Sequence, residues 1–266
     1  MPTRALRTAA AGMAAQQINI QVIANNIANI NTTSFKKNRA EFKDMMYQEV
    51  QTNLPSSEIP GVIENPGTTI QVGNGVKLSS TAKDFTQGDL RQTGFQLDVA
   101  IHGEGFLQVR QPDGEFAYTR DGALKISADG TLVTSQGYVI EPGFSLPSDI
   151  LTVEITQDGI LNVTEVGGDK VELGTIELAK FINPSGLKAL GDNLYAETEE
   201  SGVPVLGAPA SEGFGTIQQG FLESSNVDIV EEMISMITAQ RSYEINSKTV
   251  KTVEELMTIA NNLKRS

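Results

Sequence analysis

The last forty residues of the chain constrain its fold more than any other stretch. After Asn226-Val227-Asp228 the sequence continues to its last residue without a glycine or a proline, and apolar residues recur every eleven positions at Ile234, Ile245 and Leu256. Such a repeat corresponds to about 3.67 residues per turn, so the apolar stripe runs almost straight along a helix. That helix would be roughly 55 Å long at ~1.5 Å per residue. Its narrow stripe favours packing on another helix, with a core helix on the chain's own sheet as the alternative.

A second long helix is predicted near the N-terminus, over residues 3–30. Its apolar and small residues follow alternating steps of four and three, which is the spacing of a heptad seam. The seam consists of Leu6, Ala10, Met13, Gln17, Ile20, Ala24 and Ile27. Such a helix is marginal alone because most helix stability comes from a packed partner. The C-terminal stripe is the obvious partner, so the two chain ends are predicted to form one discontinuous helical domain.

The first helix ends in an asparagine-rich segment, residues 25–36, with the sequence Asn-Asn-Ile-Ala-Asn-Ile-Asn-Thr-Thr-Ser-Phe-Lys. Asparagine tolerates a left-handed backbone and bonds to nearby backbone, so a helix end followed by a loop would account for the segment. Asn25 and Asn26 nevertheless fall within the helical pattern beside the seam. Their amides could bridge to a neighbouring helix.

The pattern changes to a period of two between residues 76 and 145, which predicts short β-strands. Apolar and polar residues alternate, for example at Leu97, Val99 and Ile101, and Asp-Gly and Gln-Gly turns recur. Their spacing predicts an antiparallel meander or a small barrel. Residues 146–220 continue as β structure, with a hairpin around Asp158-Gly159. We therefore expect an α+β fold, with long terminal α-helices paired as a coiled-coil-like domain and a mainly antiparallel β middle.

The charge of the chain is distributed unevenly. The formal net charge is −13, yet residues 1–40 contain no acidic residue and carry +5, whereas residues 41–226 carry −17. An acidic body argues against nucleic acid as a partner and fits a solvated outer surface. No stretch approaches eighteen consecutive apolar residues, so no transmembrane helix is expected. The N-terminal stretch lacks the apolar core of a secretory signal.

No motif in the sequence indicates catalysis. The recurring Asp-Gly pairs lack the ligand ladder of a calcium loop, so we interpret them as turns. No helix pattern follows Gly103-Glu104-Gly105, which argues against a dinucleotide loop. His102 is the only histidine, no serine lies in a Gly-x-Ser-x-Gly elbow, and the chain has no cysteine. We expect a protein that is not an enzyme, with no catalytic, cofactor-binding or metal-binding residues.

Two segments at opposite ends of the chain resemble the signatures of bacterial flagellar rod and hook axial proteins. The first is the asparagine-rich segment, and the second spans residues 225–248, with Ser225-Asn226-Val227-Asp228 and Gln240-Arg241-Ser242-Tyr243-Glu244-Ile245-Asn246. Residues 98–106 and 118–122 of the β middle are also similar to this family. One departure is Ser34, where the family usually has glycine. A Cβ at this position raises the cost of a positive φ.

Residues 48–72 change in character to a stretch rich in proline, glycine, serine and threonine. A flexible linker is one interpretation, but loops this long in compact proteins are usually functional or disordered. In the flagellar family, an inserted stretch after the matching tyrosine, here Tyr47, marks the distal rod branch and accompanies a stiff, straight tube. We therefore expect an extended hairpin lying on neighbouring subunits. Its marker residues are Tyr47, Pro55, Pro60 and Pro66.

The resemblance implies a structural function in the flagellar basal body, in the rod that crosses the periplasm. It implies a distal rod subunit that polymerises into a rigid helical tube and transmits motor torque to the hook and filament. The implied partners are further copies in an open helical polymer, proximal rod proteins, the hook protein, the periplasmic and outer-membrane ring proteins, and the flagellar type III export apparatus. A proximal rod or hook-like paralogue is the alternative, and a β-domain binding module with a coiled-coil tail is another.

The sequence also predicts domain boundaries and an interface. Residues 1–45 and 222–266 would form the helical core domain, 46–76 the rod-specific stretch, 77–145 with 185–221 a β-domain, and 146–184 a second β segment. The expected subunit-interface residues of the helical core lie in the two terminal signatures and stripes. They are Leu6, Met13, Ile20, Asn25, Asn26, Ile27, Asn29, Phe35, Ile234, Ile237, Gln240, Arg241, Tyr243, Ile245, Asn246, Val253, Leu256 and Leu263.

Overall fold

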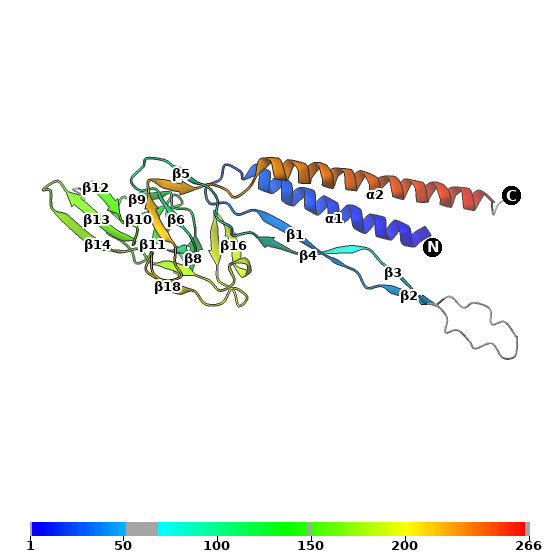
Figure 1. Cartoon of the computed structure of the whole chain (residues 1–266), viewed down its shortest axis with the longest axis horizontal. Coiled ribbons are helices and arrows are strands. Elements are labelled where there is room, and N and C mark those ends of the chain that lie inside the picture. The colour runs from blue at the N-terminus through cyan, green and yellow to red at the C-terminus, as the bar shows by residue number, and fades with distance from the viewer. Residues whose placement is uncertain (1, 52–68, 148–149, 264–266) are drawn as a thin grey trace. The chain divides into compact units, whose positions relative to one another are not determined.

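The computed structural model describes residues 2–51, 69–147 and 150–263 (Figure 1). The chain divides into two compact units. Unit 1 consists of Met1–Asn25, Arg39–Thr81 and Val230–Ser266, and unit 2 consists of Asn26–Asn38 and Ala82–Ile229. The chain therefore passes between the two units four times.

Two long helices dominate unit 1, α1 (Pro2–Ala28) and α2 (Ile229–Leu263). They run antiparallel, with the two chain ends at the same end of the pair (Figure 1). They meet at Gly12, where an added Cβ would lie 2.9 Å from the Asn246 side-chain nitrogen, so a side chain at this position would displace the Asn246 side chain. Two terminal helices around an antiparallel β middle confirm the α+β class, while coiled-coil pairing of the helices stays a prediction.

The buried face of α1 differs from its heptad seam. Within the described chain, the buried α1 side chains of unit 1 are Ala9, Ala15 and Ile23, whereas Ala10 and Gln17 of the seam are exposed. One reason is that α1 has a second neighbour, the turn before β4. An added Cβ on Gly75 of that turn would lie 3.3 Å from the Cβ of Ala11. The seam is therefore not the line along which one chain packs its own helices.

Four strands follow α1 along the chain. They are β1 (Asn38–Asp44), β2 (Gln48–Gln51), β3 (Thr69–Val72) and β4 (Val76–Lys83). Strand β1 pairs with β4, and β2 pairs antiparallel with β3 from Gln48 opposite Val72 to Gln51 opposite Thr69. This ladder is the described part of the hairpin expected at 48–72. The remaining expectation, including Pro55, Pro60 and Pro66, lies outside the described residues.

Unit 2 contains the remaining strands, which lie in the sheets of the β middle (Figure 1). A nine-stranded sheet has the order β16-β17-β8-β7-β11-β10-β9, with β15 on β7 and β18 on β15. A three-stranded sheet has the order β12-β13-β14, and β19 pairs with β6 and β20 with β5. The bounds are β5 (Leu90–Gln92), β6 (Val99–His102), β7 (Phe106–Arg110), β8 (Phe116–Thr119), β9 (Leu124–Ile126), β10 (Leu132–Thr134), β11 (Val139–Ile140), β12 (Ile150–Ile155), β13 (Ile160–Glu165), β14 (Lys170–Thr175), β15 (Leu178–Lys180), η1 (Pro184–Gly186), β16 (Lys188–Gly191), β17 (Leu194–Ala196), β18 (Val205–Gly207), β19 (Thr216–Gln219) and β20 (Phe221–Glu223).

The core of unit 2 has an aliphatic and an aromatic part. The aliphatic part joins the large sheet to the three-stranded sheet, with Leu107, Leu132, Leu161 and Ile176 fully buried. The aromatic part is a cluster of edge-to-face rings, formed by Phe85, Phe106, Tyr118, Phe181 and Tyr195. Such ring pairs add to the free energy gained from area burial, by about 0.5–1.5 kcal/mol each. The alternating pattern in the sequence therefore encodes a substantial β core.

The hairpin expected around Asp158-Gly159 is present as β12 and β13, and Gly159 has a φ of 79°, which favours glycine. The next apolar stretch, from Val171 to Phe181, does not form a single strand. The structure has two strands there, β14 in the three-stranded sheet and β15 in the large sheet. Ile176 lies between them, fully buried in the shared core, and the apolar alternation changes phase at Gly174-Thr175, where the chain changes sheets.

Candidate functional site

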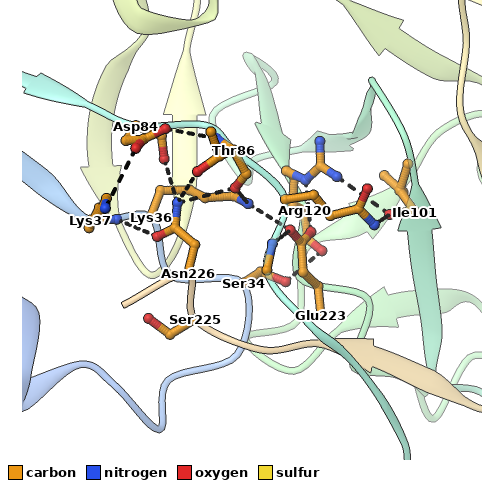
Figure 2. A network of polar contacts seen from close by, with 12 residues as sticks. Ser34, Lys36, Lys37, Asp84, Thr86, Ile101, Arg120, Glu223, Ser225 and Asn226 are labelled. Carbon is orange, nitrogen blue, oxygen red and sulfur yellow. Dashed lines mark hydrogen bonds and ion pairs between the residues drawn. The ribbon is translucent and has the colours of Figure 1, made fainter. Parts of the chain in front are cut away.

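The signature segments of the sequence meet in a buried polar cluster of unit 2 (Figure 2). Ser34 and Lys36 come from the N-terminal signature, Arg120 from the β middle, and Glu223 and Asn226 from the segment that precedes α2. We call these five residues the junction. All five belong to unit 2, although Lys36 and Glu223 are 187 positions apart in the sequence.

The centre of the junction is a carboxylate between two cations. The Lys36 ammonium donates to Glu223 Oε1 at 2.6 Å, and the Arg120 Nε donates to Glu223 Oε2 at 2.8 Å. The side chains of Lys36 and Glu223 are fully buried, and that of Arg120 is 4% exposed. Ion pairs in such a setting are strong because neither water nor salt screens them.

Backbone groups satisfy the rest of this ionic cluster. Lys36 also donates to the Thr86 carbonyl at 2.7 Å, and the Gly88 amide donates to Glu223 Oε1 at 2.9 Å. The Arg120 guanidinium donates to three carbonyls, one in β6 and two in the segment that connects β6 and β7. These are Ile101 at 3.4 Å, Gly103 at 2.9 Å and Gly105 at 3.2 Å. The carbonyl oxygens offset the second positive charge, which has no carboxylate of its own in the cluster.

Protonation equilibria follow from this arrangement. Burial lowers the pKa of the Lys36 ammonium, and the neighbouring Glu223 carboxylate opposes that shift. Burial would raise the pKa of Glu223, but Arg120 and Lys36 outweigh it and hold the pKa of this carboxyl below its usual value. Glu223 is therefore ionised at neutral pH and acts as a structural counterion.

Asn226 connects three chain segments through one side chain. Its Oδ1 accepts from the Lys37 amide at 2.8 Å, and its Nδ2 donates to the Asp84 carbonyl at 2.9 Å and to the Thr86 hydroxyl at 3.0 Å. Its own amide donates to the Phe35 carbonyl at 3.4 Å. The asparagine therefore joins the segment before α2 to the segments before β1 and after β4.

Ser34 occupies the position where the family usually has glycine. Its φ is 56°, so the sequence correctly indicated a strained backbone at this point. The residue is buried, its amide donates to the Glu223 carbonyl, and its hydroxyl donates to the Arg120 carbonyl, both at 2.8 Å. These two bonds offset the strain and bind Ser34 to the ionic centre.

A second asparagine closes the loop that follows α1. Asn26 donates through Nδ2 to the Asn38 carbonyl and accepts the Asn38 amide at Oδ1, each at 2.9 Å. Asn26 is only 2% exposed, and these two bonds hold the Asn38 backbone beside the end of α1. The chain leaves or enters unit 2 next to Asn26, Asn38, Ala82 and Ile229. The hydrogen bonds of Asn26 and Asn226 connect the segments of unit 2 that lie near these four points along the chain.

The other predicted interface residues lie in varied settings. Phe35 is buried, with the Lys83 ammonium 5.4 Å from its ring centre. Asn25 is exposed, and Leu6, Met13, Ile20, Ile27 and Asn29 are half-buried. On α2, the exposed members are Ile234, Ile237, Gln240, Arg241, Tyr243, Ile245, Leu256 and Leu263, while Asn246 and Val253 are half-buried. Tyr47 is exposed after β1. The structure of a single chain thus leaves most of these positions available to other subunits.

Sequence reasoning did not assign roles to Lys36, Arg120, Glu223 or Asn226. Lys36, Arg120 and Asn226 did stand in the quoted signatures, which was a usable signal, whereas nothing in the pattern around Glu223 marked it as a counterion. Among the described residues, no group of acidic residues and histidine could hold a metal ion. No helix within the described ranges is long and apolar enough to cross a membrane.

Three family profiles match the chain along its length. "Flagella basal body rod protein" matches residues 6–36, "Flagellar hook protein FlgE/F/G D1 domain" matches 100–163, and "Flagellar basal body rod FlgEFG protein C-terminal" matches 218–263. The three matched ranges cover most of α1, five strands of the large sheet (β7 to β11) and all of α2. Together with the full-length relatives below, they define the class: the chain belongs to the flagellar basal-body rod protein family.

Within that family, full-length relatives include the flagellar basal-body rod protein FlgG of several bacteria. The protein of Borreliella burgdorferi is 48% identical over 98% of this chain and 99% of its own length. That of Caulobacter vibrioides is 44% identical over 98% and 99%, and that of Agrobacterium fabrum is 45% identical over 98% and 100%. These relatives are structural rod proteins, which confirms that the chain is not an enzyme and belongs to the basal-body rod of the flagellum.

Proposed function

We propose that the chain is a subunit of the flagellar distal rod, which polymerises with further copies into a rigid helical tube. The observation that carries this proposal is the apolar stripe along α2. Ile234, Ile237 and Ile245 are 61%, 50% and 64% exposed, although they are large aliphatic residues on an ordered helix. Large apolar residues that recur in exposed positions along one face of a helix indicate an interaction site. Neighbouring copies of the same helices are its natural partners in an open polymer.

The distribution of charge between the units supports the same arrangement. Unit 1 contains ten basic and ten acidic residues and is neutral, whereas unit 2 contains ten basic and twenty-three acidic residues, which gives −13. A neutral helical unit can pack against many copies of itself without accumulating charge repulsion. An acidic unit 2 suits an outer, solvated layer. We accordingly propose that the helices form the inner wall and the β structure the outer layer.

The junction supports a role in transmitting torque. A single flexible linker between two units would let one turn without the other, but here four chain segments cross. Asn26 and Asn226 join these segments by side-chain hydrogen bonds, and the buried Lys36–Glu223–Arg120 cluster lies beside them. Breaking such a buried cluster costs about 3–5 kcal/mol. The four covalent crossings therefore start from segments of unit 2 that these polar contacts hold together.

The proposal includes an interface and a domain plan. The subunit interface would use the exposed and half-buried positions of α1 and α2, whereas Asn26 and Phe35 would support it from within their own chain. The domains would be residues 1–45 with 222–266 as the helical core, 46–76 as the rod-specific stretch, 77–145 with 185–221 as a β-domain, and 146–184 as a second β segment. The partners would be proximal rod proteins, the hook protein, the ring proteins and the type III export apparatus.

Sedimentation combined with circular dichroism tests this function. The full chain should gain helix as it forms large assemblies, whereas a variant without residues 1–40 and 227–266 should stay monomeric and rich in β structure. A stable helical dimer that never grows would instead favour a binding module with a coiled-coil tail. A paralogous proximal rod or hook-like role is tested by deleting residues 48–66, which should soften or curve a distal rod polymer.

A further inference from the structure

Helix α2 extends further than the helix beside it. The two helices run antiparallel and meet at Gly12 and Asn246 (Figure 1). Ten residues of α1 precede Gly12, at positions 2–11, whereas seventeen residues of α2 follow Asn246, at positions 247–263. The last seven residues of α2 therefore extend about 10 Å past the start of α1, at ~1.5 Å per residue.

The extending end of α2 has an apolar face. We call these last seven residues, 257–263, together with the preceding Leu256, the α2 overhang. Leu256, Ile259 and Leu263 are spaced at i, i+3 and i+7, which places them on one side of the helix. These residues are 59%, 57% and 73% exposed, so more than half of the surface of each is open to solvent in the single chain. A solvated helix end would carry polar residues on this side, and the overhang instead has the pattern of a helix that binds a groove.

An open apolar pocket lies elsewhere in unit 1, between α1, β3 and α2. Its volume is about 450 Å³, and it is lined by Ala5, Thr8 and Ala9 of α1, Val72 of β3, and Asn246 and Thr249 of α2. Small side chains on α1 leave the space open. An apolar cavity of about 150 Å³ holds a benzene ring, so this pocket has room for more than one aliphatic side chain.

The charges beside the two surfaces are complementary. Arg4 lines the pocket, within a segment of forty residues that contains no acidic residue. Glu254 and Glu255 directly precede the overhang, and Glu255 lies on the same side of α2 as Ile259, four positions later. A helix that placed Ile259 in the pocket would therefore bring a carboxylate toward Arg4.

The overhang cannot reach the pocket of its own chain. Thr249 lines that pocket, and Leu263 lies fourteen residues further along the same helix, which is about 20 Å at ~1.5 Å per residue. A continuous helix does not fold back on itself over that distance. The occupant must come from another molecule, and a second copy of this chain supplies an apolar end of matching size and charge.

We propose that the α2 overhang of one subunit inserts into the pocket between α1, β3 and α2 of the next subunit, with Glu255 facing Arg4. This contact joins two different surfaces, so every copy offers one of each and the series continues without closing. The inference rests on the proposed function, because it assigns one contact within the polymer. It names the two surfaces of neighbouring subunits that meet, and it gives the series of subunits a direction.

Disulfide cross-linking tests the contact directly, because the chain has no native cysteine. Chains with Thr8→Cys and chains with Ile259→Cys, distinguished by tags of different mass, are co-assembled and oxidised. We expect a cross-linked heterodimer in the polymer. The matched control replaces Ile259→Cys with Ile237→Cys, which is also exposed on α2 but lies outside the overhang. Heterodimers no more abundant than in this control, or a majority of Ile259–Ile259 homodimers, would overturn the proposal.

Charge reversal provides an independent test. We expect Arg4→Glu to raise the concentration needed for polymerisation about tenfold, which corresponds to about 1.4 kcal/mol, and Glu255→Arg to restore assembly in the double variant. Arg7→Glu is the control, since Arg7 is exposed but does not line the pocket. A double variant as defective as Arg4→Glu would count against the contact. Wild-type chain that forms no polymer would refute the proposed function itself, whereas polymers that lack the cross-link refute only this contact.

Discussion

Removing the charge of Glu223 is the sharpest test of the junction. Glu223→Gln keeps the shape of the side chain but leaves the Lys36 ammonium and the Arg120 guanidinium buried without a carboxylate. Removing one partner of a buried ion pair costs about 3–5 kcal/mol, because the remaining charge stays uncompensated. Here two cations lose their counterion at 2.6 and 2.8 Å, so we expect a loss toward the upper end of that range.

A second variant makes the reasoning specific to charge. Lys36→Met removes one cation and leaves Glu223 paired with Arg120, so the cluster becomes neutral. We therefore expect Lys36→Met to lose less stability than Glu223→Gln, although it also removes the bond to the Thr86 carbonyl. The matched surface control is Glu154→Gln, which breaks the exposed ion pair with Lys170 and should cost less than about 1 kcal/mol.

Urea unfolding of the full chain, followed by circular dichroism below the concentration of polymerisation, measures these differences. The pH dependence gives the sign of the effect. Because the pKa of Glu223 is lowered in the folded chain, its contribution is fully present above the unfolded value of about 4.5 and is lost as pH falls through the lower folded value. Equal stability losses in Glu223→Gln and Glu154→Gln, or an acid dependence unchanged in Glu223→Gln, would refute the reasoning.

Three further predictions concern the same unit. Ser34→Ala should lose about 1–2 kcal/mol in thermal or urea unfolding, because it keeps the positive φ without the bond to the Arg120 carbonyl, and Ser34→Gly should lose less. Gly122→Ala should cost at least about 3 kcal/mol or prevent folding, since the new Cβ would lie 1.8 Å from the Val99 carbonyl oxygen; a variant of native stability would contradict that packing. Burial raises the pKa of Tyr195 to about 12, so stability present below pH ~10 should fall as pH rises toward 12, and spectrophotometric titration should show this tyrosine ionising together with unfolding.

The sequence predicted the parts of the fold that depend on local periodicity. Both terminal helices were expected within a few residues of their observed limits, because a repeat of apolar positions is visible along a single segment. The hairpin at Gly159 was visible from its Asp-Gly turn, and the positive φ at Ser34 was indicated by the glycine that the family usually has there. The break between β14 and β15 was not predicted, although the apolar alternation changes phase between Leu173 and Ile176, where the chain changes sheets.

The junction depends on tertiary structure and could not be derived from periodicity. Lys36 and Glu223 are 187 positions apart, and nothing in their neighbouring residues specifies that they meet. Arg120 lies in an Arg-Asp-Gly turn. The turn accounts for the glycine at position 122, but it does not indicate that Arg120 pairs with Glu223. The heptad seam of α1 shows that a periodic pattern can also fail to predict burial. The seam residues are regularly spaced in the sequence, but Ala10 and Gln17 are exposed in the single chain. A periodic stripe indicates that a surface is suited to packing without identifying the molecule that packs on it.

Unit 1 contains segments from both ends of the chain, and this affects when it can fold. Its first helix is contributed by the first residues and its second helix by the last ones, with the whole of unit 2 inserted between them. Contacts between such distant segments form late, because closing a long loop is slow. A chain that is cut short or still emerging lacks α2 and therefore lacks both the overhang and part of the pocket wall. Only a chain that includes α2 has both surfaces of the proposed contact. A truncated chain is therefore expected not to join the polymer.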